Sequence, residues 1–200
     1  MTLPIVTPDV LSQLNACKPA RDAFEAACPN GLDPNDKAAV VAALRAGLGR
    51  WWWWARCGEL ANLDLSEVNL SRADLTNSNL SGADLARANL RVADITGANL
   101  EGTILTRANL SVANLTSANL SGADLTRADL YGSNLAGADL TRANLSGAYI
   151  TRANIKEANL SAANLAGADL TDANLTGARY STSTALPAGL DPVARGMILV

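Results

Sequence analysis

The sequence predicts a mainly β solenoid, in which short extended segments stack in coils, with a small α-helical domain before it. Three observations predict it. From Leu65 to Leu175 a bulky apolar residue occupies every fifth position, and 20 of these 23 positions are Leu. Ala stands two positions earlier in 18 of the 23 units. Between the two stands Asn or Asp in every unit except those containing Ile104 and Tyr149.

A period of five fits neither a helix nor a strand, because helices repeat apolar residues every 3.6 positions and strands every two. In an extended chain the small and the bulky residue point to one face and the Asn or Asp points away. The next inward residue comes three positions later, so the chain must turn in between. Ser, Thr, Gly and Arg fill the two turn positions in most units. Turns repeated in this way close the chain into coils, although spacing alone does not define the number of sides.

The unit A-(N/D)-L-x-x, as in Ala118-Asn119-Leu120-Ser121-Gly122, resembles the repeats of pentapeptide repeat proteins. The resemblance covers about 125 of the 200 residues and rests on three residue types that recur in phase. It implies a right-handed, four-sided (quadrilateral) parallel β-helix. On that fold, 25 units from Leu60 to Tyr180 form about six coils, in a column roughly 30 Å tall at about 4.8 Å per coil.

Three parts of the chain are predicted. Residues 1–57 lack the repeat and have helix starts at Thr7, Pro19 and Asp33, which indicates a small α-helical cap domain. Residues 58–182 form the β-helix. Residues 183–200 form a C-terminal capping tail, in which Leu186 and Leu190 are expected to cover the last coil.

Four consecutive tryptophans, Trp51, Trp52, Trp53 and Trp54, stand just before the repeat. The simpler interpretation is that the N-terminal helices cap the open end of the solenoid and that some of the indoles cover its first coil. The other interpretation is a surface that binds a partner, since four successive side chains of a helix cannot all face inward. The two interpretations are compatible.

The composition argues against several classes of function. A formal net charge of −3, no apolar run of membrane-spanning length and no signal-peptide pattern at the N-terminus favour a cytoplasmic protein that crosses no membrane. The chain has no histidine, which excludes His-dependent catalysis and His-ligated metal. Cys17, Cys28 and Cys57 are too few and too scattered for a disulfide framework or a thiolate metal site. We therefore expect no cofactor, no metal and no enzymatic activity.

The outer surface offers two candidate sites. If a coil takes four units, residues 20 apart stack, and Arg87, Arg107 and Arg127 form a column that could bind an anionic partner. The alternative is a solvated column without a binding role. In that case Asp84 and Asp124, each three residues before an arginine, partly neutralise its charge. Ile104 and Tyr149 replace the outward polar residue and are predicted to be apolar spots on adjacent sides of the column, either as part of an interface or as tolerated surface substitutions.

The resemblance also bears on function. Family members that inhibit or protect DNA gyrase resemble duplex DNA and are strongly acidic, with Phe at many central positions and, in some, inserted loops. This chain has Leu or Ile at all 23 central positions, and residues 59–182 carry 13 acidic and 9 basic residues.

We therefore predict a rigid interaction or scaffold protein with a protein partner and no nucleic-acid partner. The partner could also be a second copy of this chain, in a homodimer joined through a column end. A DNA mimic that binds gyrase is the alternative function.

Overall fold

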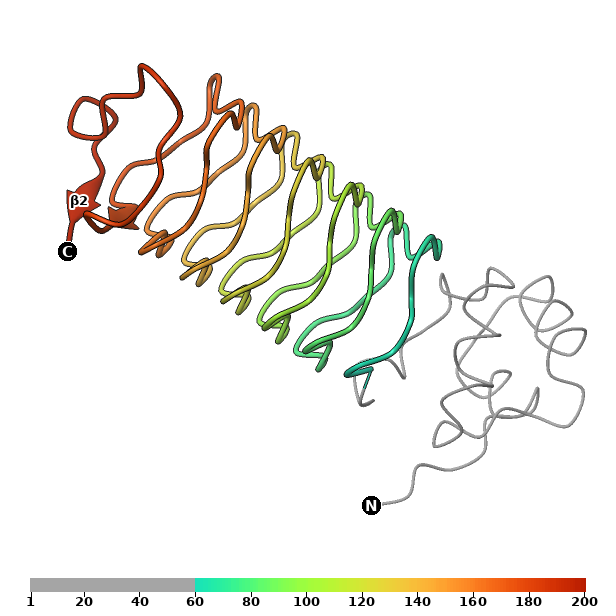
Figure 1. The fold of residues 1–200 in the computed structure, drawn as a ribbon. Helices are drawn as coiled ribbons and strands as arrows, with labels where there is room; N and C mark the ends of the chain where they lie inside the picture. The colour runs from blue at the N-terminus through green and yellow to red at the C-terminus, as the bar shows by residue number, and fades with distance from the viewer. Residues whose placement is uncertain (1–59) are drawn as a thin grey trace, which may run out of the picture.

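The computed structural model describes residues 60–200, which form a column of stacked coils closed at one end by the C-terminal segment (Figure 1). The predicted helical domain, the four tryptophans and the three cysteines lie outside the described residues. The repeat and the tail can therefore be compared with the sequence predictions, whereas the N-terminal cap stays a prediction.

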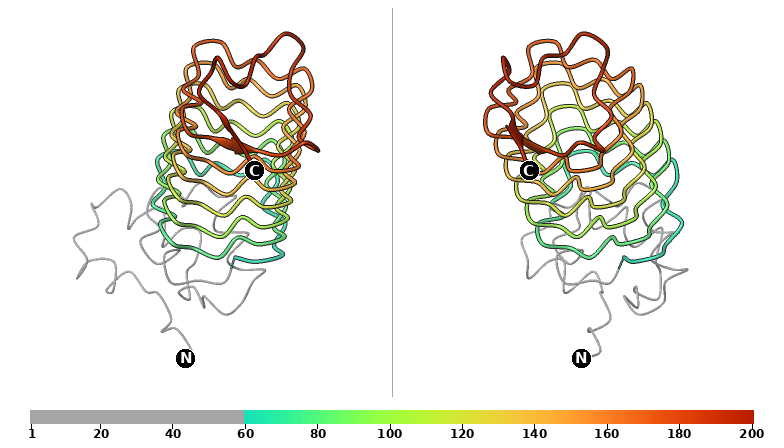
Figure 2. Two further views of the ribbon diagram at one scale, coloured as in Figure 1. Left: turned by 90° about the vertical axis from the view of Figure 1, so that its left-hand side faces the viewer. Right: turned by 60° about the vertical axis from the view of Figure 1, so that its left-hand side comes forward.

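Each coil takes 20 residues and has four sides. Parallel bridges join Asn119 to Asn99 in the preceding coil and to Asp139 in the following one, and the same step of 20 repeats along four columns of residues. These bridges explain how successive coils lie directly above one another in both views of Figure 2. The chain therefore forms a four-sided parallel β-helix, as the resemblance implies.

Within residues 60–200, only two segments form strands longer than a single bridge, because a turn follows each bridging residue within two positions. Strand β1 comprises Arg179–Tyr180 and strand β2 comprises Ile198–Leu199. They pair in parallel, with Arg179 opposite Ile198 and Tyr180 opposite Leu199. The last strand of the chain thus extends one side of the column.

The interior consists of the bulky and the small residues of each unit. Leu120 and Ala118, for example, have no exposed surface. Where Ser or Thr replaces the inward Ala, its hydroxyl donates to a backbone carbonyl; these bonds are Ser78 to Leu75, Thr103 to Leu80 and Ser133 to Leu130. No buried side-chain polar atom in residues 60–200 lacks a partner. The interior is therefore apolar except where a hydroxyl is internally satisfied.

A β-turn separates each side from the next. In a typical turn the amide of Ala123 donates to the carbonyl of Leu120 at 3.0 Å, and Gly122 between them has a φ of 65°. All 24 residues at this third turn position, from Asn62 to Gly177, have positive φ, which is the mark of a type II turn. Fifteen of them are not glycine, so the repeat imposes the left-handed conformation on residues that disfavour it.

The outward Asn or Asp has a structural role in the turn. The side-chain oxygen of Asn119 accepts hydrogen bonds from the backbone N–H of Ser121 at 3.0 Å and from its hydroxyl at 2.7 Å. Its amide nitrogen donates to the side-chain oxygen of Asn99, one coil earlier, at 3.1 Å. The residue thus satisfies a turn N–H that the backbone ladder leaves unused and also joins two coils.

The C-terminal segment folds back on the end of the column. Leu186 and Leu190 pack against the core, and Met197 is buried. Arg195 donates from one guanidinium nitrogen to the carbonyl oxygens of Leu170 at 3.2 Å and Ala173 at 2.7 Å. Leu and Ala ladders at this end are thereby covered, and carbonyls of the last coil gain a charged donor.

Candidate interaction surface

One side of the column differs from the others, and we call it the tyrosine side. It carries the bridging residues Asn69, Asn89, Asn109, Asp129, Tyr149 and Asp169, together with the turn residues along its two edges. Among residues 60–180, the exposed large hydrophobic residues are Val92, Ile104, Val112, Tyr131 and Tyr149. All except Ile104 belong to the tyrosine side, and Ile104 lies on the side that precedes it in the coil.

Tyr149 is the most exposed of these residues, at 59% of its surface, and Ile104 is 42% exposed. Both positions therefore lie outward on adjacent sides, as their place in the repeat predicts. Sequence reasoning missed Tyr131, Val92 and Val112. Each occupies one of the two turn positions, where Ser, Thr, Gly or Arg is usual. An apolar or aromatic residue at a turn position could therefore have identified them from the sequence.

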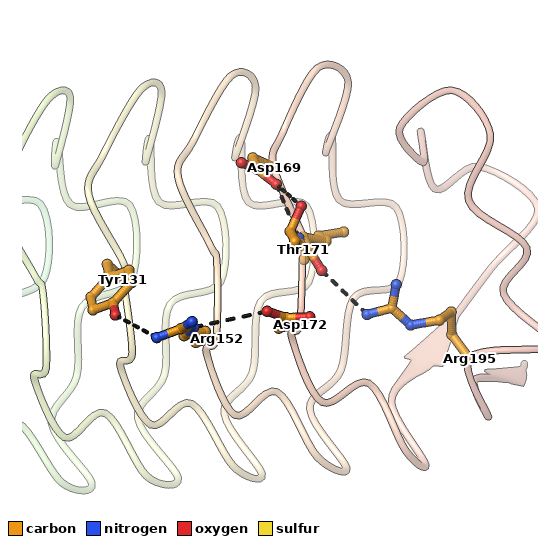
Figure 3. A network of polar contacts seen from close by, with 7 residues as sticks. Tyr131, Arg152, Asp169, Thr171, Asp172 and Arg195 are labelled. Atoms are coloured by element: carbon orange, nitrogen blue, oxygen red, sulfur yellow. Dashed lines mark hydrogen bonds and ion pairs between the residues drawn. The ribbon is translucent and has the colours of Figure 1, made fainter.

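The side chain of Tyr131 is held by a residue from the next coil (Figure 3). A guanidinium nitrogen of Arg152 donates to its hydroxyl at 3.2 Å, and Nε of Arg152 lies 3.8 Å from a carboxylate oxygen of Asp172. The two charged side chains are about two-thirds exposed, so the ion pair adds little stability. Its effect is to align Tyr131, Arg152 and Asp172 along one edge of the tyrosine side.

The tyrosine side also lacks the amide links that join coils elsewhere. On the other three sides a side-chain amide donates to the Asn or Asp one coil earlier, in the pairs Asn99–Asn79, Asn119–Asn99, Asn114–Asp94, Asn134–Asn114, Asn154–Asn134, Asn174–Asn154, Asn144–Asp124 and Asn164–Asn144. Among the described residues no such bond occurs on the tyrosine side. The amide groups of Asn89 and Asn109 are therefore not used between coils.

The predicted arginine column runs along the edge where the tyrosine side begins. It borders a groove of about 570 Å³, which we call the arginine groove. Its lining residues are Ser66, Glu67, Ala86, Arg87, Thr106, Arg107, Thr126 and Arg127. The structure thus brings together the three arginines that the sequence placed 20 residues apart.

The charges of the column are only partly compensated. Arg87 lies 3.4 Å from Glu67, and both side chains are largely exposed. Within residues 60–200, Arg107 and Arg127 form no ion pair. Within residues 60–200, neither Asp84 nor Asp124 forms an ion pair with these arginines, so the predicted partial neutralisation does not take the form of direct ion pairing.

The two aspartates instead hold the turns. Asp84 accepts from the backbone N–H of Ala86 at 2.9 Å. Asp124 accepts from the backbone N–H of Thr126 at 3.0 Å, from its hydroxyl, and from the hydroxyl of Thr106 at 3.1 Å. Burial alone would raise the pKa of Asp124, but the hydrogen bonds from Thr126 and Thr106 outweigh it and hold that pKa below its usual value. The carboxylate is therefore ionised and already saturated with donors.

Charge divides unevenly around the column. The tyrosine side with its edges has six basic and four acidic residues: Arg72, Arg87, Arg91, Arg107, Arg127 and Arg152 against Glu67, Asp129, Asp169 and Asp172. The rest of residues 60–180 has three basic and eight acidic residues: Arg142, Lys156 and Arg179 against Asp64, Asp74, Asp84, Asp94, Glu101, Asp124, Asp139 and Glu157. The tyrosine side is thus the basic part of a predominantly acidic column.

Other kinds of site find no support in the part of the chain that the structure describes. No group of three or more His, Cys, Asp or Glu residues there could hold a metal ion. No helix in residues 60–200 is long and apolar enough to cross a membrane.

Comparisons with known proteins agree with this architecture. The family model described as pentapeptide repeats matches residues 59–91, 93–130, 118–156 and 153–179, with eight copies. No curated protein sequence matches the chain.

Among solved structures, trypsin-treated QnrB1, a plasmid-mediated fluoroquinolone resistance protein, is similar at 22% identity with a TM-score of 0.61, over 70% of this chain and 76% of QnrB1. HetL, a pentapeptide repeat protein involved in heterocyst differentiation regulation from the cyanobacterium Nostoc sp. strain PCC 7120, is 29% identical with a TM-score of 0.41, over 68% of this chain and 71% of HetL. The family match covers more than half of the chain, and the likeness to QnrB1 concerns the fold alone.

Proposed function

This chain belongs to the pentapeptide repeat family, and we propose that it acts as a rigid protein-binding module rather than as an enzyme. The observation that carries the proposal is the gathering of exposed aromatic and aliphatic side chains on the tyrosine side, beside a row of arginines. Tyr and Arg are enriched at the energetic centres of protein interfaces. On composition, we propose that the module works in the cytoplasm.

Rigidity supports this role. Backbone hydrogen bonds join each coil to the next on all four sides, and the Leu and Ala side chains of the interior are buried. A surface built on about six such coils keeps its side chains in place before a partner arrives. Binding then costs little conformational entropy in this chain.

Site-specific crosslinking tests the proposal. The photoreactive residue benzoylphenylalanine replaces Tyr149 in the full chain, and a control carries it at Asn119 on another side of the column. Illumination in an extract of the cells that make the protein should give an adduct of discrete mass from position 149 and not from position 119. Absence of any discrete adduct from position 149, or equal adducts from both positions, would overturn the proposal.

A homodimer through the C-terminal end of the column is one form that the partner could take. Ile198, Leu199 and Val200 are each more than half exposed there. Sedimentation velocity from 1 to 100 μM measures this association directly, and a single monomeric species throughout would leave a different protein as the partner.

Binding to DNA gyrase as a DNA mimic is the second candidate, since the shape of the column resembles QnrB1. The charge argues against it. Residues 60–180 carry twelve acidic and nine basic residues, a net charge of −3. A duplex as long as six coils, roughly 29 Å, carries about 17 negative charges. We expect no inhibition or protection of gyrase at micromolar concentration, and a clear effect in a supercoiling assay would contradict this expectation.

A further inference from the structure

We propose that the arginine groove binds an extended, acidic protein segment whose apolar side chain packs on Tyr149. This inference rests on the proposed function and names the chemistry of the partner. It follows from the geometry of the groove, from the charges left uncompensated within it, and from the apolar residues beside it.

The geometry favours an extended ligand. Arg87, Arg107 and Arg127 are spaced by one coil, about 4.8 Å, so their cations form a line rather than a cluster. The same column of positions continues with Gly147 and Gly167, which have no side chain. A segment lying along the column from Arg87 onward therefore meets three cationic side chains, of which Arg87 is already paired with Glu67, and then a flat stretch beside Tyr149.

The charges of the groove favour carboxylates. Among the described residues no acid pairs with Arg107 or Arg127, so their guanidinium donors face water. The groove hydroxyls are already engaged, since those of Thr106 and Thr126 donate to Asp124. The arginines are thus the donors that remain for a ligand, and a guanidinium group matches the two oxygens of a carboxylate.

The surroundings favour a protein over a nucleic acid. The rest of the column has eight acidic and three basic residues, which repel a polyphosphate chain that extends beyond the groove. Tyr149, 59% exposed, lies one coil beyond Arg127 and offers an apolar surface with a polar tip. A protein segment that combines carboxylates with one apolar anchor satisfies both features.

The test uses the full chain and two matched variants. Arg107→Glu reverses a charge in the groove, and Arg142→Glu makes the same change on an edge away from the tyrosine side. The two arginines have the same φ of 58°, so the backbone strain at the substituted position is the same in both variants. In the described part of the chain neither arginine forms an ion pair, so neither substitution breaks one. Thermal unfolding of each variant verifies that both fold.

The probe is a fluorescein-labelled 12-residue peptide of alternating Glu and Ser with a central Trp, followed by fluorescence anisotropy in 50 mM and 200 mM NaCl. We expect binding that weakens with salt, a loss of at least tenfold in affinity for Arg107→Glu, and less than a twofold change for Arg142→Glu. Tyr149→Ser should weaken binding to the Trp peptide, but not to a peptide with Ser in its place.

Several results would overturn the inference. The first is that the parent chain does not bind the peptide, and the second is that Arg107→Glu and Arg142→Glu lose the same affinity. The third is that a peptide with Lys in place of Glu binds equally well. The fourth is that single-stranded DNA binds more tightly than the peptide and depends on Arg107 in the same way. Self-association that Arg107→Glu abolishes would replace the acidic segment with a second copy of this chain. A crosslinked partner at position 149 that Arg107→Glu does not affect would leave the proposed function standing and overturn only this inference.

Discussion

Replacing Asn119 by alanine removes one outward residue of the repeat and tests whether these residues stabilise the column. Asn119 accepts two hydrogen bonds from Ser121 and donates one to Asn99. Both Asn119 and Ser121 are half-buried, so water replaces part of what is lost. At about 0.5–1 kcal/mol for each of three such bonds, the free energy of unfolding should fall by about 2 kcal/mol.

Asn119→Asp is the matched variant because a carboxylate keeps the acceptor of the turn and loses only the donor to Asn99. It also adds a charge one coil from Asp139. Two unit charges about 4.8 Å apart repel by about 0.9 kcal/mol in water. The lost bond, at about 0.5–1 kcal/mol, and the repulsion together should cost the aspartate variant about 1.5–2 kcal/mol at low salt, and the repulsive part of this loss should shrink in 0.5 M NaCl. The alanine variant should lose the same amount at both salt concentrations.

Urea denaturation followed by circular dichroism measures these differences, provided that the dependence on urea concentration is unchanged. If Asn119→Ala is as stable as the parent chain, the outward amide has no energetic role and its recurrence needs another explanation. If the aspartate variant responds to salt no more than the alanine variant, repulsion along the column is too weak to count.

Three further predictions concern the interior, a turn and acid stability. Leu120→Asp should lower the free energy of unfolding by several kcal/mol, because it buries an unpaired charge at a position with no exposed surface; a variant with the melting temperature of the parent would refute the inward register. Gly122→Val should cost about 1–2 kcal/mol in urea denaturation although no atom lies within 4 Å of the added Cβ, because its φ is 65°. The lowered pKa of Asp124 contributes stability that is present above the unfolded value near 4 and is lost as the pH falls through the folded value. Asp124→Asn should therefore lose less stability than the parent between pH 6 and pH 2, and an identical loss would show that this carboxylate is not linked to acid unfolding.

The sequence by itself determined the repeat, its phase and the residues that point inward. This was possible because three residue types recur together every five positions, so each unit repeats the same local conformation. The outward positions of Ile104 and Tyr149 and the stacking of the arginine column follow from the same phase once a coil takes four units. The number of sides required the family resemblance, because a period of five is compatible with coils of different size.

Only the tertiary structure decided what the outward residues do. Asp84 and Asp124 are close to the arginines in sequence, yet their carboxylates bind turn N–H and hydroxyl groups and leave Arg107 and Arg127 uncompensated. The grouping of Tyr131 with Arg152 and of Val92 with Val112 likewise depends on which residues stack at a step of 20. The bonds from Thr106 to Asp124 and from Arg152 to Tyr131 join residues of different coils, so they can form only when the coils are stacked.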